Sequence, residues 1–294
     1  MGKIFWIASY PKSGNTWMRA ILTSLFHTQD GNFNFTLFDK ITSFDTIDNY
    51  SFVKKIDKED YNKLNELPIL SKYWIKAQNK YKEINNFSFF KTHSSNVILD
   101  KNHYTSQSSC NGLIYLIRDP RDVVISYSKH YRQDIDSVIN LMNDKNHVFT
   151  PHKLDKSINK MLLPYLISSW DIHYKTWLNL DVPKIIIKYE SLLIEPKNTI
   201  NLIINFFKKN YKIQFNDENK IINNILKTTK FENLKDYERK NGFNEASYFF
   251  FKKGIAEYFF RKGISGQWQD ELKKNQIKKI ESNFESTMKE LYYL

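Results

Sequence analysis

The sequence predicts an α/β fold of three layers, in which helices cover both faces of a central, mostly parallel sheet. Short runs of consecutive apolar residues, typical of strands buried on both faces, recur along the chain. Segments whose apolar residues recur every three or four positions, as in amphipathic helices, lie between and after these runs. The composition supports a large core, since 41% of the 294 residues are hydrophobic and 16% are aromatic. The predicted strands are Ile4–Ala8, Phe87–Phe90, Leu113–Ile117 and Ile185–Ile187.

Helices are predicted between and after these strands. A first helix with an apolar face from Trp17 to Leu25 follows the first strand. Asp119 and Pro120 indicate where a helix begins after the third strand, because aspartate is a favoured N-cap and proline is tolerated at the first helical position. Pro196 opens another helix in the same way. The remaining predicted helices lie in Met161–Leu180 and Asn275–Leu291.

The charge balance and the single cysteine limit the class of protein. Lys and Arg number 44 against 32 Asp and Glu, and the net charge of +12 favours an anionic partner such as nucleic acid, anionic lipid or a multiply charged ligand. The single cysteine, Cys110, excludes an internal disulfide and a cysteine-rich zinc site, and we expect a cytoplasmic location. No signal peptide and no apolar stretch of membrane-spanning length is found, so no membrane partner is expected. Without repeats or a flexible linker, residues 1–294 are predicted to form a single domain.

The loop Tyr10–Thr16, between the first strand and the first helix, is a candidate phosphate-binding site. Such a loop lies at the carboxyl edge of the sheet, where the helix N-terminus offers unpaired N–H groups and partial positive charge. Lys12 adds a full charge, and small residues beside it let an anion approach the backbone. The ATP-binding pattern G-x-x-x-x-G-K-[ST] fails, because Asn15 replaces its lysine and Ser9 its first glycine. The loop is therefore predicted to bind phosphate without serving a γ-phosphate and Mg²⁺; an ordinary turn with a surface lysine is the alternative.

Later segments place more polar groups at the same edge. Lys91 and His93 follow the second strand and share one side of it, because side chains alternate along a strand. Arg118 ends the third strand and Ser126 lies two turns into the next helix; arginine makes planar, bidentate contacts to phosphate. The turn Arg261–Gly263 is basic. Each segment alone has a plainer explanation: a capping histidine, an ion pair of Arg118 with the aspartate four residues on, or a basic surface turn.

Together these segments resemble the signatures of the PAPS-dependent sulfotransferases, most closely the cytosolic and bacterial branch. The resemblance runs in the family's order from residue 4 to residue 268. It implies a P-loop-like α/β domain and the cofactor 3′-phosphoadenosine 5′-phosphosulfate (PAPS), released as PAP, with no metal. The matching motifs are Tyr10-Pro-Lys-Ser-Gly-Asn-Thr-Trp17, Lys91-Thr-His93, Arg118-Asp-Pro-Arg-Asp-Val-Val-Ile-Ser126 and Arg261-Lys-Gly-x-x-Gly266.

The resemblance also implies a role for each matching residue. His93 would act as the general base for the acceptor hydroxyl, because neutral imidazole suits that work near pH 7. Lys12 would meet the bridging oxygen, where charge builds in a loose, in-line transfer, and Lys91 would assist at the sulfonate. For the aromatic residues among the implied cofactor contacts, core packing is the alternative. The implied cofactor-binding residues are Lys12, Ser13, Gly14, Asn15, Thr16, Trp17, Arg118, Ser126, Tyr189, Thr229, Phe231, Arg261, Lys262 and Gly263.

Two positions depart from the family pattern, and the acceptor stays open. Asn15 stands where many relatives carry threonine; its backbone donor remains, so little change is expected. Gln267 stands where an aspartate often precedes the tryptophan. The expected acceptor is a small-molecule or carbohydrate hydroxyl, or an amine. Candidate acceptor segments are Phe33–Trp74, His130–His152 and Phe243–Phe251.

Other classes of function remain as alternatives. An ATP-dependent kinase on the same scaffold would need a lysine after the loop glycine and an aspartate that binds Mg²⁺. A basic nucleic-acid-binding module would explain the net charge of +12 without any catalysis. We expect no nucleic-acid partner, because the motifs at the sheet edge account for the charge through a small anionic cofactor. The oligomeric state is left open.

Overall fold

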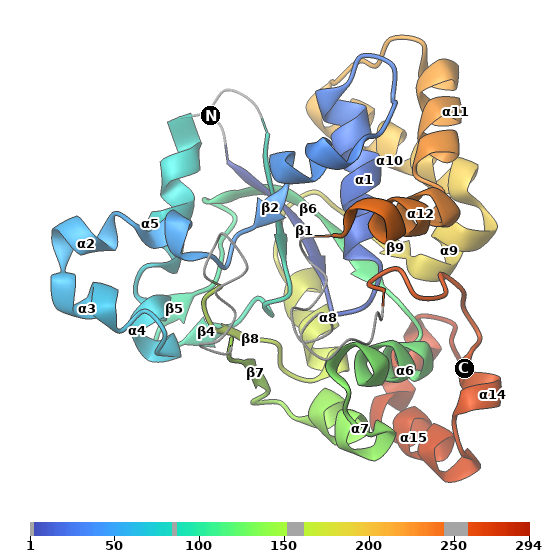
Figure 1. Ribbon diagram of the computed structural model, residues 1–294. Coiled ribbons are helices and arrows are strands. Elements are labelled where there is room, and N and C mark those ends of the chain that lie inside the picture. Colours follow the sequence, from blue (N-terminus) through green and yellow to red (C-terminus); the bar gives the residue numbers. More distant parts are fainter. Residues whose placement is uncertain (1–2, 84–86, 152–161, 244–257) are drawn as a thin grey trace.

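A five-stranded parallel sheet forms the centre of the protein (Figure 1). The structure is a computed structural model and describes residues 3–83, 87–151, 162–243 and 258–294. The predicted α/β class and all four predicted strands are confirmed, with ends that differ by a few residues. In spatial order the strands are β2 (Thr42–Ser43), β3 (Ser88–Thr92), β1 (Ile4–Ser9), β6 (Cys110–Ile117) and β9 (Lys184–Lys188).

Alternate side chains of β1 enter two separate cores, which explains its unbroken apolar sequence. Phe5 and Ile7 pack with α1 (Asn15–His27), α10 (Pro196–Tyr211) and α11 (Glu218–Thr228). Trp6 and Ala8 face the opposite core. That second core is closed by α5 (Trp74–Asn79), α6 (Pro120–Tyr131), α7 (Ile135–Asn143), α8 (Trp170–Leu178) and α15 (Lys274–Glu290), which confirms the three-layer arrangement (Figure 1).

The register of the central strands brings their carboxyl ends to one edge. Ile7 of β1 lies opposite Lys91 of β3 on one side and Ile114 of β6 on the other. Because these strands are parallel, the residues that follow them, including His93 and Arg118, meet at the same place. The sheet therefore positions the predicted site.

One predicted helix is wrong in its first half. In place of a helix from Met161, the described chain forms β8 (Tyr165–Leu166), which pairs antiparallel with β7 (Val148–Phe149), and α8 begins only at Trp170. Pro164 explains the error, since proline in a helix interior removes a hydrogen bond and clashes with the preceding turn. Met161 itself lies outside the described residues.

The other predicted helix starts are confirmed. The Asp119 carboxylate accepts a hydrogen bond of 2.9 Å from the N–H of Arg121, as expected of an N-cap. In the described ranges no helix is both long and apolar enough to cross a membrane. Further elements are η1 (Phe35–Lys40), η2 (Ile47–Tyr50), α2 (Val53–Ile56), α3 (Lys58–Asn62), α4 (Leu67–Ser71), η3 (Lys80–Glu83), β4 (Ile98–Leu99), β5 (Asn102–His103), α9 (Tyr189–Ile194), α12 (Phe231–Asn241) and α14 (Trp268–Glu271).

Candidate functional site

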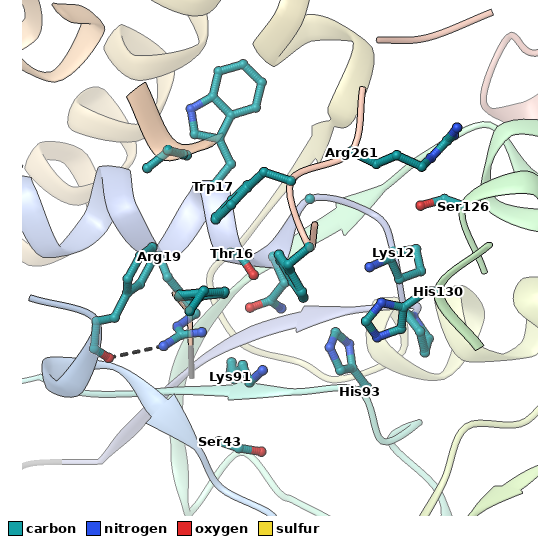
Figure 2. A pocket seen from close by; sticks show the side chains of 18 of the residues that line it. Lys12, Thr16, Trp17, Arg19, Ser43, Lys91, His93, Ser126, His130 and Arg261 are labelled. Atoms are coloured by element: carbon teal, nitrogen blue, oxygen red, sulfur yellow. Dashed lines mark hydrogen bonds between the residues drawn. The ribbon is translucent and has the colours of Figure 1, made fainter. Parts of the chain in front are cut away.

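A cavity of about 940 Å³ opens at the carboxyl edge of the sheet (Figure 2). It brings together nearly all of the residues predicted from the sequence, which come from six separate segments of the chain. Ser13 and Thr229 are the exceptions: both are buried, and the Thr229 hydroxyl donates to the carbonyl of Ile225 at 2.8 Å. The predicted residues that line the cavity are Lys12, Gly14, Asn15, Thr16, Trp17, Lys91, His93, Arg118, Ser126, Tyr189, Phe231, Arg261, Lys262 and Gly263.

The loop before α1 has the strained backbone of a binding loop. Lys12 and Gly14 both have positive φ, of 70° and 97°. A Cβ at Gly14 would lie 2.7 Å from the Tyr189 ring, so glycine is required there for space as well as for conformation. A non-glycine residue such as Lys12 adopts this conformation at a cost, and such strain gathers at functional sites.

Buried polar atoms around this loop have no hydrogen-bond partner among the described residues. They are Ser13 Oγ, Asn15 Oδ1, Trp17 Nε1 and Arg118 Nε. Buried polar groups in folded proteins are nearly always hydrogen-bonded, so four such atoms around one helix N-terminus fit a site that receives a polar ligand. The donors and the nearby cations suit a phosphate-bearing nucleotide.

Lys12 is the cation at the centre of the site. It is half-buried, and its Nζ lies 4.5 Å from the centroid of the Phe259 ring. Burial, together with the charges of Arg118, Lys91 and Arg261, lowers the pKa of Lys12 to about 7. A bound anion would favour the ammonium form again.

Arg118 connects the loop Tyr10–Thr16 to the chain just after the Arg261–Gly263 turn. Its guanidinium donates to the carbonyl of Lys12 at 3.1 Å and to that of Ile264 at 2.9 Å. It also lies over the Tyr189 ring, 4.3 Å from the centroid. The alternative ion pair with Asp122 is long, at 4.0 Å; the Asp122 carboxylate instead accepts from the N–H of Gly266, at 2.6 Å.

The hydrogen bonds of His93 fix which of its ring nitrogens can act as a base. Nδ1 lies 2.8 Å from the carbonyl oxygen of Ser9. A carbonyl only accepts, so we assign the ring proton to Nδ1, which leaves the lone pair of the neutral imidazole on Nε2. The His93 carbonyl accepts from Nε2 of His173 at 3.2 Å, and the Tyr115 hydroxyl donates to Nδ1 of His173 at 2.7 Å. Burial lowers the pKa of His173 to about 3, so it stays neutral and holds the His93 main chain in place.

Asn15 connects the Lys12 loop to His93. Its side-chain amide donates to the Ile7 carbonyl and to Ser9 Oγ, both at 3.1 Å, and Ser9 Oγ lies 3.2 Å from His93 Nδ1. The side chain of Asn15 therefore makes contacts toward His93 that the comparison with threonine in the family pattern did not predict.

For the PAPS-dependent activity that the motif resemblance implies, replacing Asn15 by alanine is expected to lower kcat by up to about tenfold, because one buried hydrogen bond contributes about 0.5–1.5 kcal/mol. The Kd for PAP should change less, since the backbone donors of the loop remain. Single-turnover rates and calorimetric PAP titrations measure the two effects. Asn62→Ala, an exposed change on α3, is the control. Unchanged single-turnover rates for Asn15→Ala would contradict the connection.

The Arg261–Gly263 turn is fixed from both sides. Arg261 donates to Oε1 of Gln267 at 2.7 Å, so the glutamine that departs from the family pattern still makes a loop contact. Lys262 pairs with Glu271 at 2.6 Å. A Cβ at Gly263 would lie 2.4 Å from the Phe231 ring. Phe231 thus both packs under the turn and lines the cavity.

Arg19 also lines the cavity, although it was given no role from the sequence, and so does His130, the first residue of a predicted acceptor segment. Arg19 is buried and donates to the carbonyls of Ile41, at 2.8 Å, and Phe38, at 3.1 Å, so it holds the end of η1 against α1. Arg19 lies one turn after Thr16. Its position as a charged residue on an otherwise apolar helix face could have indicated a role at the site. His130 lies one turn after Ser126; burial and the charges of Lys12, Lys91 and His93 lower its pKa well below the usual value.

Part of the remaining wall comes from the segments predicted for the acceptor, and part from α12 and from Phe259 and Phe260. In the described part of the chain, aromatic and hydroxyl side chains from all three segments line the cavity. Most of Phe243–Phe251 lies outside the described residues. The lining residues from these segments are Phe35, Thr36, Phe38, Asp39, Thr42, Ser43, Thr46, His130, Tyr131, Phe149 and Phe243.

Comparisons with known proteins agree with this architecture. Mouse sulfotransferase 1B1 is 26% identical over 289 residues, which cover 96% of this chain and 81% of the relative. Human sulfotransferase 1E1 is 23% identical over 288 residues, which cover 97% and 83%.

Solved structures share the fold. Mouse sulfotransferase SULT7A1 complexed with PAP has a TM-score of 0.58 at 18% identity, covering 98% of this chain and 85% of that one. Retinol dehydratase in complex with androsterone and inactive cofactor PAP has a TM-score of 0.59 at 18% identity, covering 97% and 80%. The family model of the sulfotransferase domain matches residues 3–292. The chain therefore belongs to the sulfotransferase family, as the resemblance of its motifs to the PAPS-dependent enzymes predicts.

Proposed function

We propose that this sulfotransferase moves the sulfonate group of PAPS to a hydroxyl group of a small-molecule or carbohydrate acceptor, with His93 as the general base. One observation carries the proposal: Lys12, Lys91 and His93 line the same cavity as the loop whose buried polar atoms lack partners among the described residues. The PAP-bound relatives of the same fold support the choice of cofactor. We further expect a cytoplasmic enzyme that needs no metal.

When bound, PAPS supplies the sulfonate group, and its 5′-phosphate takes up the electron pair of the broken sulfur–oxygen bond. The N-terminus of α1 and Lys12 would hold that end of the cofactor, and the Lys12 ammonium would stabilise the charge that develops there. Arg118, Ser126 and the Arg261–Gly263 turn would hold the 3′-phosphate, and Trp17, Tyr189 and Phe231 the adenine. Thr229, which does not line the cavity, would support this wall from behind.

His93 would remove the proton of the acceptor hydroxyl through Nε2. Its Nδ1–H stays on the Ser9 carbonyl, 2.8 Å away, which stabilises the imidazolium formed by proton transfer. Lys91 would lie beside the transferring group, since it lies on β3 two residues before His93, which follows the strand directly, and side chains two residues apart share one side.

Calorimetric titration with PAP, and with ATP·Mg²⁺ in parallel, tests the proposal. PAP is expected to bind with micromolar or tighter affinity and ATP much more weakly. Arg118→Ala should weaken PAP binding by about tenfold or more, because a charge-assisted contact contributes about 1.5–3 kcal/mol. Arg239→Ala, which changes an exposed arginine, is the control.

The other outcomes select the alternatives. Preference for ATP over PAP would favour a kinase. Steeply salt-dependent binding to long DNA or RNA that PAP does not displace would favour a nucleic-acid-binding module. Failure to bind either nucleotide would overturn the proposed function.

PAP binding at pH 8 is expected to take up protons. The pKa of Lys12 is about 7, so much of its side chain is neutral at pH 8 and must gain a proton when the phosphates bind. The Kd should therefore rise above pH 7, by up to about tenfold per pH unit. Titrations in HEPES and in Tris, whose ionisation enthalpies differ, measure the number of protons. The same observed enthalpy in both buffers would contradict this coupling.

A further inference from the structure

Side chains on one face of helix α12 hold the segment Tyr258–Gly263. The Phe231 ring packs under Gly263. Lys235 Nζ donates to the carbonyl of Arg261 at 3.1 Å. The Glu238 carboxylate accepts from the main-chain N–H groups of Phe259, at 2.6 Å, and Phe260, at 2.9 Å. These three positions are four and three residues apart, so they share one face of the helix.

A glutamate at this position of the helix destabilises the fold unless its carboxylate makes compensating contacts. Its side chain is buried, only 5% exposed, and lies toward the carboxyl end of α12, where the helix dipole disfavours negative charge. Burial raises the pKa of Glu238, while its two hydrogen bonds and the charge of Lys12 act in the opposite direction. A leucine could fill the same space, but only an acceptor pair satisfies both main-chain N–H groups.

The segment that Glu238 holds reaches both ends of the proposed cofactor site. Phe259 covers the Lys12 ammonium, with Nζ 4.5 Å from the ring centroid. Two residues further on, the Arg261–Gly263 turn enters the cavity, and Figure 2 shows Arg261 near Ser126, on the side of the cavity where Lys12 also lies. A shift of the main chain at Phe259 and Phe260 would therefore move the turn that meets the 3′-phosphate.

We infer that Glu238 is a positioning residue for the cofactor, which fixes the main chain of Phe259 and Phe260 so that the Arg261–Gly263 turn contacts the 3′-phosphate. The inference rests on the proposed function. It predicts a larger effect at the 3′-phosphate end, because the Arg261–Gly263 turn directly continues the main chain that Glu238 holds, whereas Glu238 reaches Lys12 through the Phe259 ring and its charge. Ligands with a 3′-phosphate should therefore depend on Glu238 much more strongly than ligands without one.

Glu238→Gln tests this selectivity. The amide keeps the size of the side chain, but it turns one acceptor into a donor that faces a main-chain N–H. The Kd for PAP is expected to rise by about tenfold or more. The Kd for 5′-AMP, which lacks the 3′-phosphate, should stay within about twofold. Glu232→Gln, the same change at an exposed position of α12, should leave both values unchanged.

Lys235→Met gives a second, milder test of the same segment, because it removes the hydrogen bond to the Arg261 carbonyl. It should also raise the Kd for PAP relative to the Kd for 5′-AMP. If Glu238→Gln does not fold, this variant tests whether α12 positions the turn. The titrations are made well below the unfolding temperature of each variant, so that differences in stability do not alter the measured dissociation constants.

The outcomes separate this inference from the proposed function. If the wild-type protein does not bind PAP, the proposed function fails and the inference fails with it. If the wild type binds PAP and Glu238→Gln binds it equally well, or weakens PAP and 5′-AMP by the same factor, only the positioning role is overturned.

Discussion

Replacing His93 by alanine is expected to lower kcat/KM by roughly 10²–10⁴, the usual contribution of a general base, while PAP still binds with nearly the wild-type Kd. The separation follows from the site: His93 lies at the end of β3, and the implied phosphate contacts come from α1, α6 and the Arg261–Gly263 turn. Initial rates of PAP formation with the best acceptor from a panel of phenols, alcohols and sugars measure the first effect, and calorimetry measures the second.

His93→Asn distinguishes chemistry from structure at this position. An asparagine amide can still donate to the Ser9 carbonyl, which His93 Nδ1 contacts at 2.8 Å, but it cannot accept a proton as Nε2 does. The asparagine variant should therefore be as inactive as the alanine variant and more stable. His103→Ala, which changes an exposed histidine on β5, should retain full activity. Equal losses of activity and PAP affinity in His93→Asn would indicate a structural role instead.

Much of the fold was predictable because both faces of the sheet are covered. Strands such as β1 and β6 are buried on both sides, so each appears in the sequence as a continuous apolar run. Strand β2 gives no such run, because it consists of two polar residues that are only half-buried. The false helix from Met161 arose because apolar periodicity outweighed the signal of Pro164.

The candidate site was predictable where residues follow strands and not where the contacts are tertiary. Lys12, His93 and Arg118 all follow strands that end at one edge, so topology alone brings them together. The carboxylate of Glu238, by contrast, meets main-chain N–H groups about twenty residues away in the sequence, and no spacing rule indicates such a pair. Asn15 was recognised as a departure from the family, but its contact with Ser9 depends on the positive φ of the loop before it.

Replacing Lys12 by methionine is expected to lower kcat/KM by at least 10²–10³, roughly the cost of losing one group that stabilises developing charge. PAP affinity should fall as well, because the same ammonium would contact the 5′-phosphate in the ground state. Lys12→Met differs from His93→Asn in this respect, and the pair of variants assigns the two roles. Wild-type turnover in Lys12→Met would overturn the assignment of this lysine to the transfer step.

The same Lys12→Met change is expected to make the protein more stable. The pKa of Lys12 is about 7 in the folded protein and 10.5 for a lysine side chain free in water, so the unfolded chain binds more protons between these pH values. Stability from this group therefore increases as the pH rises from 7 to 10.5, and below pH 7 the cost of the buried charge is fully present. Methionine removes that cost, and it fills the same space beside the Phe259 ring.

The difference in Tm between Lys12→Met and wild type should consequently be largest at pH 6 and shrink toward pH 10. Thermal unfolding at several pH values measures it, with Lys129→Met, at an exposed position of α6, as the control. Sites that bring like charges together commonly lower the stability of the fold. Here the loss of stability is expected to depend on pH through the protonation of Lys12. A Tm difference that is the same at pH 6 and pH 10 would show that the charge of Lys12 is not destabilising, and would remove the physical basis for its lowered pKa.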